Sequence, residues 1–209
     1  MTNTALDQAL QTLERATSTP ELVKATQALC ALNDLEAVKP LVKVLGFNNP
    51  AVAAVATQGL IQLGRDTIPI LLVSLDARNY GARAWVVKVI AALRDPRGLD
   101  LLEHALQADI APSVRRSATR GLADLELSED AAHDQLERCF EGLLKAVRDD
   151  EWVVRYAAAY GLEQRLNSAA VSAHLAEQGL ALNQLASDAE GVRVVQLRAL
   201  KALQRLNAG

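Results

Sequence analysis

The stretch VRYAAAYGL, residues 154–162, decides the fold, because the chain repeats its pattern of apolar and small residues. Its apolar positions fall three and four residues apart, which predicts a helix with one buried face. Copies in the same register recur at intervals of about 30 to 40 residues, a period typical of helical repeat proteins. They are VAAVATQGL (52–60), ARAWVVKVI (82–90), VRRSATRGL (114–122) and VRVVQLRAL (192–200).

A second amphipathic stretch precedes each copy, so the repeating unit is a pair of helices. Because one helical hairpin cannot bury its apolar face alone, neighbouring hairpins stack into a continuous core. The prediction is an all-α solenoid of HEAT type, a right-handed superhelix of about five to six hairpins. The preceding stretches are LEAVKPLVKVLG (35–46), TIPILLVSL (67–75), GLDLLEHALQA (98–108), AHDQLERCFEGLLKAVR (132–148) and VSAHLAEQGLALNQLA (171–186).

We expect a single solenoid over residues 1–209 rather than separate domains. Residues 1–33 are interpreted as a degenerate N-terminal capping hairpin, residues 34–162 as the core repeats and residues 163–209 as a C-terminal repeat.

The composition narrows the function classes. Half of the residues are hydrophobic but only 3% are aromatic, which favours closely packed helices over sheets. A net charge of −3 argues against a general nucleic-acid binder, because non-specific phosphate binding needs a basic surface. With no signal peptide and no apolar run of membrane-spanning length, we expect a cytoplasmic protein without membrane insertion.

Familiar enzyme signatures are missing from the sequence. It has no Gly-rich phosphate loop, no HExxH and no nucleophile motif, and its three histidines lack metal-ligand spacing, so no metal site is expected. Cys30 and Cys139 have no CxxC partner and are expected to be reduced, buried thiols.

The second helices carry a stripe that is separate from the core positions. Counting from the second residue of each copy, which is Arg in four of the five, the residues one and five positions later stack on one helix face. In HEAT-type solenoids the second helices line the concave side, so the stripe predicts a groove. Its pairs are Ala54 and Gln58, Ala84 and Lys88, Arg116 and Arg120, Tyr156 and Tyr160, and Val194 and Arg198.

Several of these positions also have a structural interpretation. Trp85 lies beside a core column, which favours packing, whereas Trp152 and Tyr80 share a column at the helix start where contact with a ligand or partner stays open. The Arg column is interpreted as pairing with acidic groups in the loops between hairpins, such as Asp109 or Asp150. This column consists of Arg83, Arg115, Arg155 and Arg193.

Three strings carry a family resemblance: NNPAVAAVATQGL (48–60), RNYGARAW (78–85) and DEWVVRYAAAYGL (150–162). They resemble the HEAT-like repeats of the phycobilisome lyases, and in particular the smaller, F-type subunits of heterodimeric phycocyanin α-subunit phycocyanobilin lyases. The similarity runs from about residue 35 to residue 165, and the remainder is generically helical.

The resemblance implies one half of an enzyme. With a larger E-type HEAT subunit as heterodimer, it would bind phycocyanobilin as substrate, without a prosthetic group, and attach it by a thioether to a cysteine of the phycocyanin α subunit. Related isomerising lyases carry a His-Cys pair in the loop that here reads GFNNP, residues 46–50. Asn48 and Asn49 stand there instead, which favours attachment without isomerisation.

The implied chemistry assigns roles to the stripe and its neighbours. Two propionates call for cations, first Arg116 and Arg120 with Lys88 in support, and flat pyrrole rings call for aromatic walls. A carboxylate from Asp150 or Glu151 would favour the protonated bilin, although both also suit a helix start. The remaining candidate bilin-binding residues are Tyr80, Arg83, Trp85, Trp152, Arg155, Tyr156 and Tyr160.

Two alternatives stay open. One is a non-catalytic HEAT adaptor or chaperone in phycobilisome assembly or disassembly, with Trp152 as an interface anchor. The other is a reverse lyase that removes chromophores through the same groove. An obligate partner is a further expectation. It rests on the short array, on the family resemblance and on apolar residues in the N-terminal cap, Leu6, Leu10 and Leu13, because an open solenoid end needs a polar cap or another chain.

Overall fold

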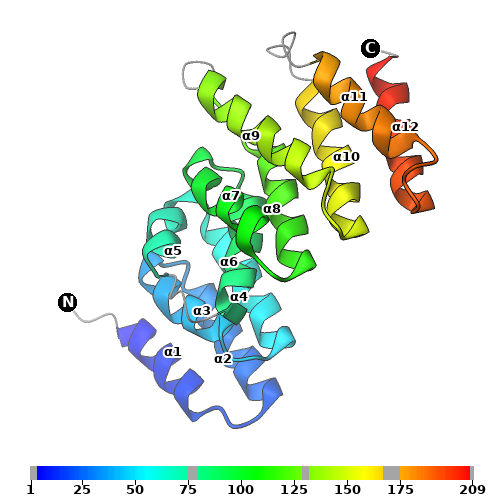
Figure 1. The fold of residues 1–209 in the computed structure, drawn as a ribbon. Helices are drawn as coiled ribbons and strands as arrows, with labels where there is room; N and C mark the ends of the chain where they lie inside the picture. Colours follow the sequence, from blue (N-terminus) through cyan, green and yellow to red (C-terminus); the bar gives the residue numbers. More distant parts are fainter. Residues whose placement is uncertain (1–3, 75–79, 129–131, 167–174, 208–209) are drawn as a thin grey trace. The chain divides into compact units, whose positions relative to one another are not determined.

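The computed structural model describes residues 4–74, 80–128, 132–166 and 175–207, and these form twelve α-helices and three short 3-10 helices (Figure 1). The described residues contain no strand, which confirms the all-α prediction. Among them no helix is long and apolar enough to cross a membrane. The contacts divide the chain into two compact units, Met1–Leu93 and Arg94–Gly209.

In the first unit, the second helices of successive hairpins pack against each other: α2 against α4, and α4 against α6. The first helices α3 and α5 are also neighbours. The elements are α1 (Thr4–Arg15), α2 (Thr19–Ala31), η1 (Leu35–Ala37), α3 (Val38–Leu45), α4 (Pro50–Leu63), η2 (Arg65–Thr67), α5 (Ile68–Ser74) and α6 (Tyr80–Leu93).

The second unit repeats this arrangement. Its second helices α8, α10 and α12 pack in series, while α7 contacts α9 on the other layer (Figure 1). The elements are η3 (Pro96–Gly98), α7 (Leu99–Ala108), α8 (Pro112–Asp124), α9 (Ala132–Ala146), α10 (Trp152–Leu166), α11 (Leu175–Ala186) and α12 (Arg193–Leu206). Within each unit the predicted helical hairpins are confirmed; one solenoid over residues 1–209 stays a prediction.

Local sequence signals explain where several helices begin. Asn49 accepts hydrogen bonds from the N–H groups of Ala51 and Val52, and Pro50 occupies the first turn of α4, where its missing N–H costs least. A 3-10 turn precedes α3, α5 and α7, which the periodicity did not predict. At η3 the Asp95 carboxylate accepts from the N–H of Arg97 and stabilises that turn.

The N-terminal cap differs from the expectation that it offers free apolar surface. Leu6 and Leu13 are buried, with 9% and 8% of their surface exposed, in a helix that packs on α2. Leu10 is half-buried. The Ser18 and Glu21 side chains form a capping box that starts α2 and closes the hairpin. These leucines therefore do not argue for a partner at this end.

Close packing in the second unit depends on Gly161 of α10. A Cβ atom at this position would lie 2.5 Å from Leu143 Cδ2 and 3.0 Å from Ala123 Cβ. We expect Gly161→Ala to lower the free energy of unfolding by about 1–3 kcal/mol, because the neighbouring helices must move apart. Gly179 of α11 has no atom within 4 Å of the corresponding Cβ, so Gly179→Ala should raise it by about 0.5–1 kcal/mol. Urea unfolding checks both; two variants of equal stability would contradict the packing argument.

Candidate functional site

The stripe residues of the second unit lie on three adjacent helices. We call them the Arg–Tyr row: Arg116 and Arg120 of α8, Tyr156 and Tyr160 of α10, and Arg198 of α12. Tyr160 connects the helices, because the guanidinium carbon of Arg120 lies 3.8 Å from the centroid of its ring and that of Arg198 lies 5.4 Å from the same centroid. Both distances are typical of cation–π contacts. Three residues of the predicted stripe, Arg120, Tyr160 and Arg198, are therefore in contact across the three helices.

Arg116 and Arg120 keep their hydrogen-bond donors free. Both side chains are exposed, and among the described residues neither has a hydrogen bond or ion pair, apart from the ring contact of Arg120. A guanidinium carries five N–H donors in one plane and binds carboxylates with two parallel hydrogen bonds. Because Arg120 is stacked on Tyr160, its plane is oriented while its donor edge stays open. This pair of cations suits an anionic, flat ligand.

The Arg column has a different role. Nε and Nη2 of Arg115 donate to the two carboxylate oxygens of Asp149 at 2.7 and 2.9 Å, and Nη1 donates to the carbonyl oxygens of Asp109 and Ile110 at 3.0 and 3.1 Å. The guanidinium thus ties the start of its own helix to the next hairpin. The pKa of Arg115 is raised, first by its hydrogen bond to Asp149.

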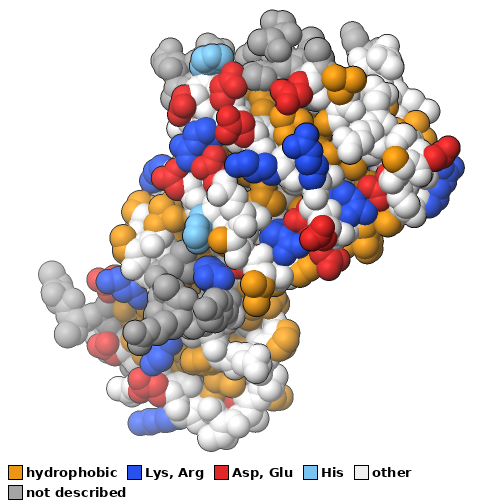
Figure 2. Space-filling view, viewed as in Figure 1, with side chains coloured by type: hydrophobic (Ala, Val, Ile, Leu, Met, Phe, Trp, Pro, Cys, Tyr) orange, Lys and Arg blue, Asp and Glu red, His pale blue; other side chains and the backbone are white. Residues whose placement is uncertain are grey.

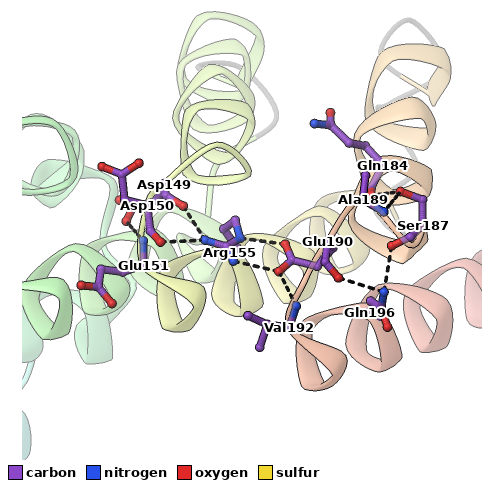
Figure 3. A network of polar contacts seen from close by, with 10 residues as sticks. All are labelled: Asp149, Asp150, Glu151, Arg155, Gln184, Ser187, Ala189, Glu190, Val192 and Gln196. Atoms are coloured by element: carbon purple, nitrogen blue, oxygen red, sulfur yellow. Dashed lines mark hydrogen bonds and ion pairs between the residues drawn. The ribbon is translucent and has the colours of Figure 1, made fainter.

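Arg155, near the start of α10, makes the same kinds of contact as Arg115 (Figure 3). Nε and Nη2 of Arg155 donate to the Glu190 carboxylate at 2.7 and 2.8 Å, and Nη1 donates to the carbonyl oxygens of Asp149 and Asp150 at 2.8 and 2.9 Å. Pairing of the Arg column with loop acids is therefore confirmed for Arg115 and Arg155. The acids are Asp149 and Glu190, whereas Asp150, named from the sequence, contributes its backbone carbonyl.

These pairs predict loss of stability in acid. The hydrogen bond from Arg155 holds the pKa of Glu190 below its ordinary value, and for Asp149 the hydrogen bonds from Arg115 and Glu151 N–H outweigh burial, so its pKa is also lowered. A lowered folded-state pKa adds stability that is complete above the unfolded-state pKa of about 4 and disappears as the pH falls through the folded value. Urea unfolding should give constant stability from about pH 7 to 5 and a decline below about pH 4; stability that rises on acidification would contradict this.

One carboxylate contacts Tyr160, and a second holds the neighbouring Arg198. Its hydroxyl donates to Asp124 Oδ1 at 3.0 Å, and its pKa is raised, first by burial and then by Asp124, so the phenol remains protonated. Glu163 is 1% exposed and forms ion pairs with Arg198 at 2.6 Å and Arg205 at 2.8 Å. Arg198 is therefore a structural cation that closes one side of the row.

Asp150, Glu151 and Trp152 lie at the start of α10. Trp152, the first residue of α10, is 43% exposed, as expected for a position near solvent. Asp150 and Glu151 are also exposed, and it is the carboxylate of Asp149 that accepts from the Glu151 N–H at 2.9 Å. A hollow of about 370 Å³ opens beside Asp150 and Arg155. Asp150 and Glu151 therefore keep carboxylates at the surface.

The other candidates belong to the first unit. Tyr80 begins α6, but its side chain lies outside the described residues. Trp85 and Arg83 are half-buried, so Trp85 is less enclosed than a core position. The Lys88 ammonium lies 4.5 Å from the centroid of the Trp85 ring, in a second cation–aromatic contact one turn apart on α6.

Sequence reasoning missed Asp124, Glu163 and Glu190. Asp124 follows Arg120 by four residues, so helical spacing alone could have placed it beside the stripe. Glu163 and Glu190 had no comparable signal, because their partners come from other hairpins.

On the face drawn in Figure 2, the acidic and basic side chains are interspersed. The described residues contain no group of His, Cys, Asp or Glu side chains arranged to hold a metal ion.

Comparison with known proteins places this architecture. A family model described as HEAT repeats matches residues 48–123. The bilin biosynthesis protein RpcF of Synechococcus sp. (strain WH8020) is 56% identical over 201 residues, which cover 96% of each chain. The phycocyanobilin lyase subunit beta of Nostoc sp. (strain PCC 7120) is 44% identical over 71% of this chain and 76% of that protein.

A solved structure agrees with these relatives. A chain in the complex of CpcE and CpcF of phycocyanin lyase from Nostoc sp. PCC7120 superposes with a TM-score of 0.72 at 39% identity, over 81% of this chain and 99% of that chain. The resemblance drawn from the three sequence strings is thereby confirmed. The chain belongs to the family of phycocyanobilin lyase beta subunits.

Proposed function

We propose that this chain is the F-type subunit of a heterodimeric lyase that attaches phycocyanobilin, without isomerisation, to a cysteine of the phycocyanin α subunit. Its partner is an E-type subunit, and the complex works in the cytoplasm. The observation that carries the proposal is the pair of exposed guanidinium groups, Arg116 and Arg120, whose donors stay free beside the Tyr160 ring.

The Arg–Tyr row suits an open-chain tetrapyrrole. Arg116 and Arg120 would each bind a propionate through two N–H donors, while Tyr156 and Tyr160 offer half-buried rings against which a pyrrole ring can pack. Asp124 accepts from Tyr160 through Oδ1, which leaves Oδ2 for a pyrrole N–H. A carboxylate there would favour the protonated, more electrophilic bilin.

The reaction itself needs no nucleophile from this chain. The sulfur of the acceptor cysteine bonds to the ethylidene carbon of the bilin, the thiol proton ends on the bilin, and nothing leaves. The lyase must therefore hold a flexible substrate in one geometry and keep competing thiols away, which is catalysis mainly by orientation. The sequence, without an enzyme nucleophile motif, agrees with this division of labour.

The remaining candidates stay proposals. In the first unit, Trp85 and Lys88 form a second cation–aromatic pair and, with Tyr80 and Arg83, are further candidates for contact with the bilin. Near the start of α10, Trp152 would add an aromatic wall. Asp150 and Glu151, both exposed, are further candidates for the acid that favours protonation, whereas Arg155 would act indirectly by holding their loop through its carbonyl contacts.

The GFNNP loop supports attachment without isomerisation. Asn48 has a positive φ of 51° and Asn49 caps α4, so both residues already have structural roles. The product should show the absorption spectrum of an unrearranged phycocyanobilin thioether. A blue-shifted product in which a double bond has migrated would contradict this part of the proposal.

A non-catalytic adaptor is the second candidate, favoured by the exposed Trp152 side chain, which resembles an interface anchor. The two are separated by purifying the chain with its E-type partner from a host that makes phycocyanobilin. Under the lyase proposal, bilin absorbance co-purifies with the pair and is lost when Arg116 and Arg120 are replaced by alanine. A pair that binds phycocyanin but never bilin would overturn the proposal in favour of the adaptor. Chromophore loss from loaded phycocyanin would instead show the reverse direction.

A further inference from the structure

The last helix exposes positions that are covered in the two helices before it. Four residues after the column Arg, Thr119 of α8 and Ala159 of α10 are both 0% exposed, whereas Leu197 of α12 is 50% exposed. Seven residues after it, Leu122 and Leu162 are 0% exposed, whereas Leu200 is 38% exposed. The second helix of the next hairpin packs on each of the first two: α10 packs on α8, and α12 packs on α10. Within the 209 residues no further repeat follows α12.

The hydrogen bonds of the Arg column also change at this helix. Arg115 and Arg155 use Nη1 for two loop carbonyls and use Nε with Nη2 for a carboxylate of the next hairpin. At the α12 joint, the buried Gln196 amide takes over the carbonyl contacts, donating to Ser187 and Glu190 oxygens at 3.0 and 2.8 Å (Figure 3).

Arg193 is thereby left with an open edge. Its side chain is exposed, and its Nη1 donates to Gln196 Oε1 at 3.1 Å. Among the described residues, Nε and Nη2 have no partner. In Arg115 and Arg155 the same two atoms donate to a carboxylate. Arg193 therefore has these two donors but, among the described residues, no carboxylate that accepts from them.

We infer that the face formed by Arg193, Val194, Leu197 and Leu200, the α12 end face, is the docking site of the E-type subunit. That subunit would stack a helical hairpin on α12 as the next repeat and supply one Asp or Glu carboxylate to Nε and Nη2 of Arg193. This inference rests on the proposed heterodimer and adds where its subunits meet.

Charge supports a partner rather than a second copy of this chain. Arg193 and Lys201 are exposed cations on α12, whereas Arg198 and Arg205 are already paired with Glu163. Because Arg193–Leu206 contains no Asp or Glu, two α12 end faces would bring like charges together. Val194, Leu197 and Leu200 supply the apolar centre, with Leu197 the most exposed of the three. A partner helix with an apolar stripe beside a carboxylate matches both features.

The test is the dissociation constant of the heterodimer, measured by titration calorimetry with the purified E-type subunit. Leu197→Asp should weaken association by about 100-fold or more and Arg193→Gln by about tenfold or more. Matched controls are Val73→Asp on α5, an 80% exposed apolar position, and Arg148→Gln, an exposed Arg; both should bind within about threefold of the unmodified chain. Thermal melting verifies that all four variants fold.

The outcomes separate the inference from the proposed function. If the unmodified chain binds the E-type subunit and both α12 variants bind equally well, the docking site is wrong and the proposed function stands. If the unmodified chain alone forms a dimer that Leu197→Asp dissociates, the face belongs to a second copy and the inferred occupant is wrong. If the unmodified chain does not bind the E-type subunit, the proposed function itself fails.

Discussion

Replacing Arg116 and Arg120 together with alanine should slow chromophore attachment by about 100-fold or more, because each charge-assisted contact to a propionate contributes about 1.5–3 kcal/mol. The fold should survive, since both side chains are exposed and, among the described residues, make no hydrogen bond or ion pair. The measurement is the initial rate with saturating E-type subunit and acceptor, alongside the melting temperature.

The control for this variant is Arg148→Ala, which removes an exposed Arg of the same unit that is not part of the row. It should keep the rate within about twofold of the unmodified chain. Single variants should each lose part of the rate, and lysine at either position should restore only part of it, because an ammonium cannot form two parallel bonds to a carboxylate. A double variant that attaches bilin at the original rate would exclude the row as the propionate site.

Replacing Arg155 with methionine should lower the free energy of unfolding by about 3–5 kcal/mol, because it leaves the carboxylate of Glu190 buried without its cation. Glu190 is 7% exposed, and the same guanidinium also holds the carbonyl oxygens of Asp149 and Asp150. Urea unfolding measures the effect, and the double variant with Glu190→Leu should recover part of the loss.

The matched control is Arg193→Met, one joint further along. This Arg contacts Gln196 of its own helix and, among the described residues, pairs with no acid, so its loss should change the free energy of unfolding by about 0.5 kcal/mol or less. Equal losses for the two variants would mean that the carboxylate pair is not what stabilises the joint.

The sequence predicted the architecture well because the apolar spacing of the repeat reflects burial directly. The helical hairpins and the stripe that includes the Arg–Tyr row follow from local spacing. Partners across hairpins do not: nothing in the local pattern of Arg155 points to Glu190, which lies 35 residues later. The 3-10 turns were missed for a similar reason, since they depend on how each hairpin enters its neighbour.

Two pairs of leucines show the limit of spacing arguments. Leu6 and Leu13 were interpreted as an open apolar end, but their face packs within the N-terminal hairpin. Leu197 and Leu200 stand in columns that are fully buried in α8 and α10, yet in α12 both are exposed, because among the described residues no later helix packs on them. A column shows which residues one repeat offers to its neighbours; whether a neighbour is present depends on the assembly.

The central claim is that this chain and an E-type subunit together attach phycocyanobilin, and that the Arg–Tyr row binds this substrate. The most direct measurement is co-expression of the chain, an E-type subunit, the phycocyanin α subunit and a phycocyanobilin source, followed by mass spectrometry of the acceptor. The account predicts one bilin bound by a thioether to a single cysteine, lost when either lyase subunit is omitted. An acceptor that carries no bilin with both subunits present, or carries equal amounts without this chain, would contradict it.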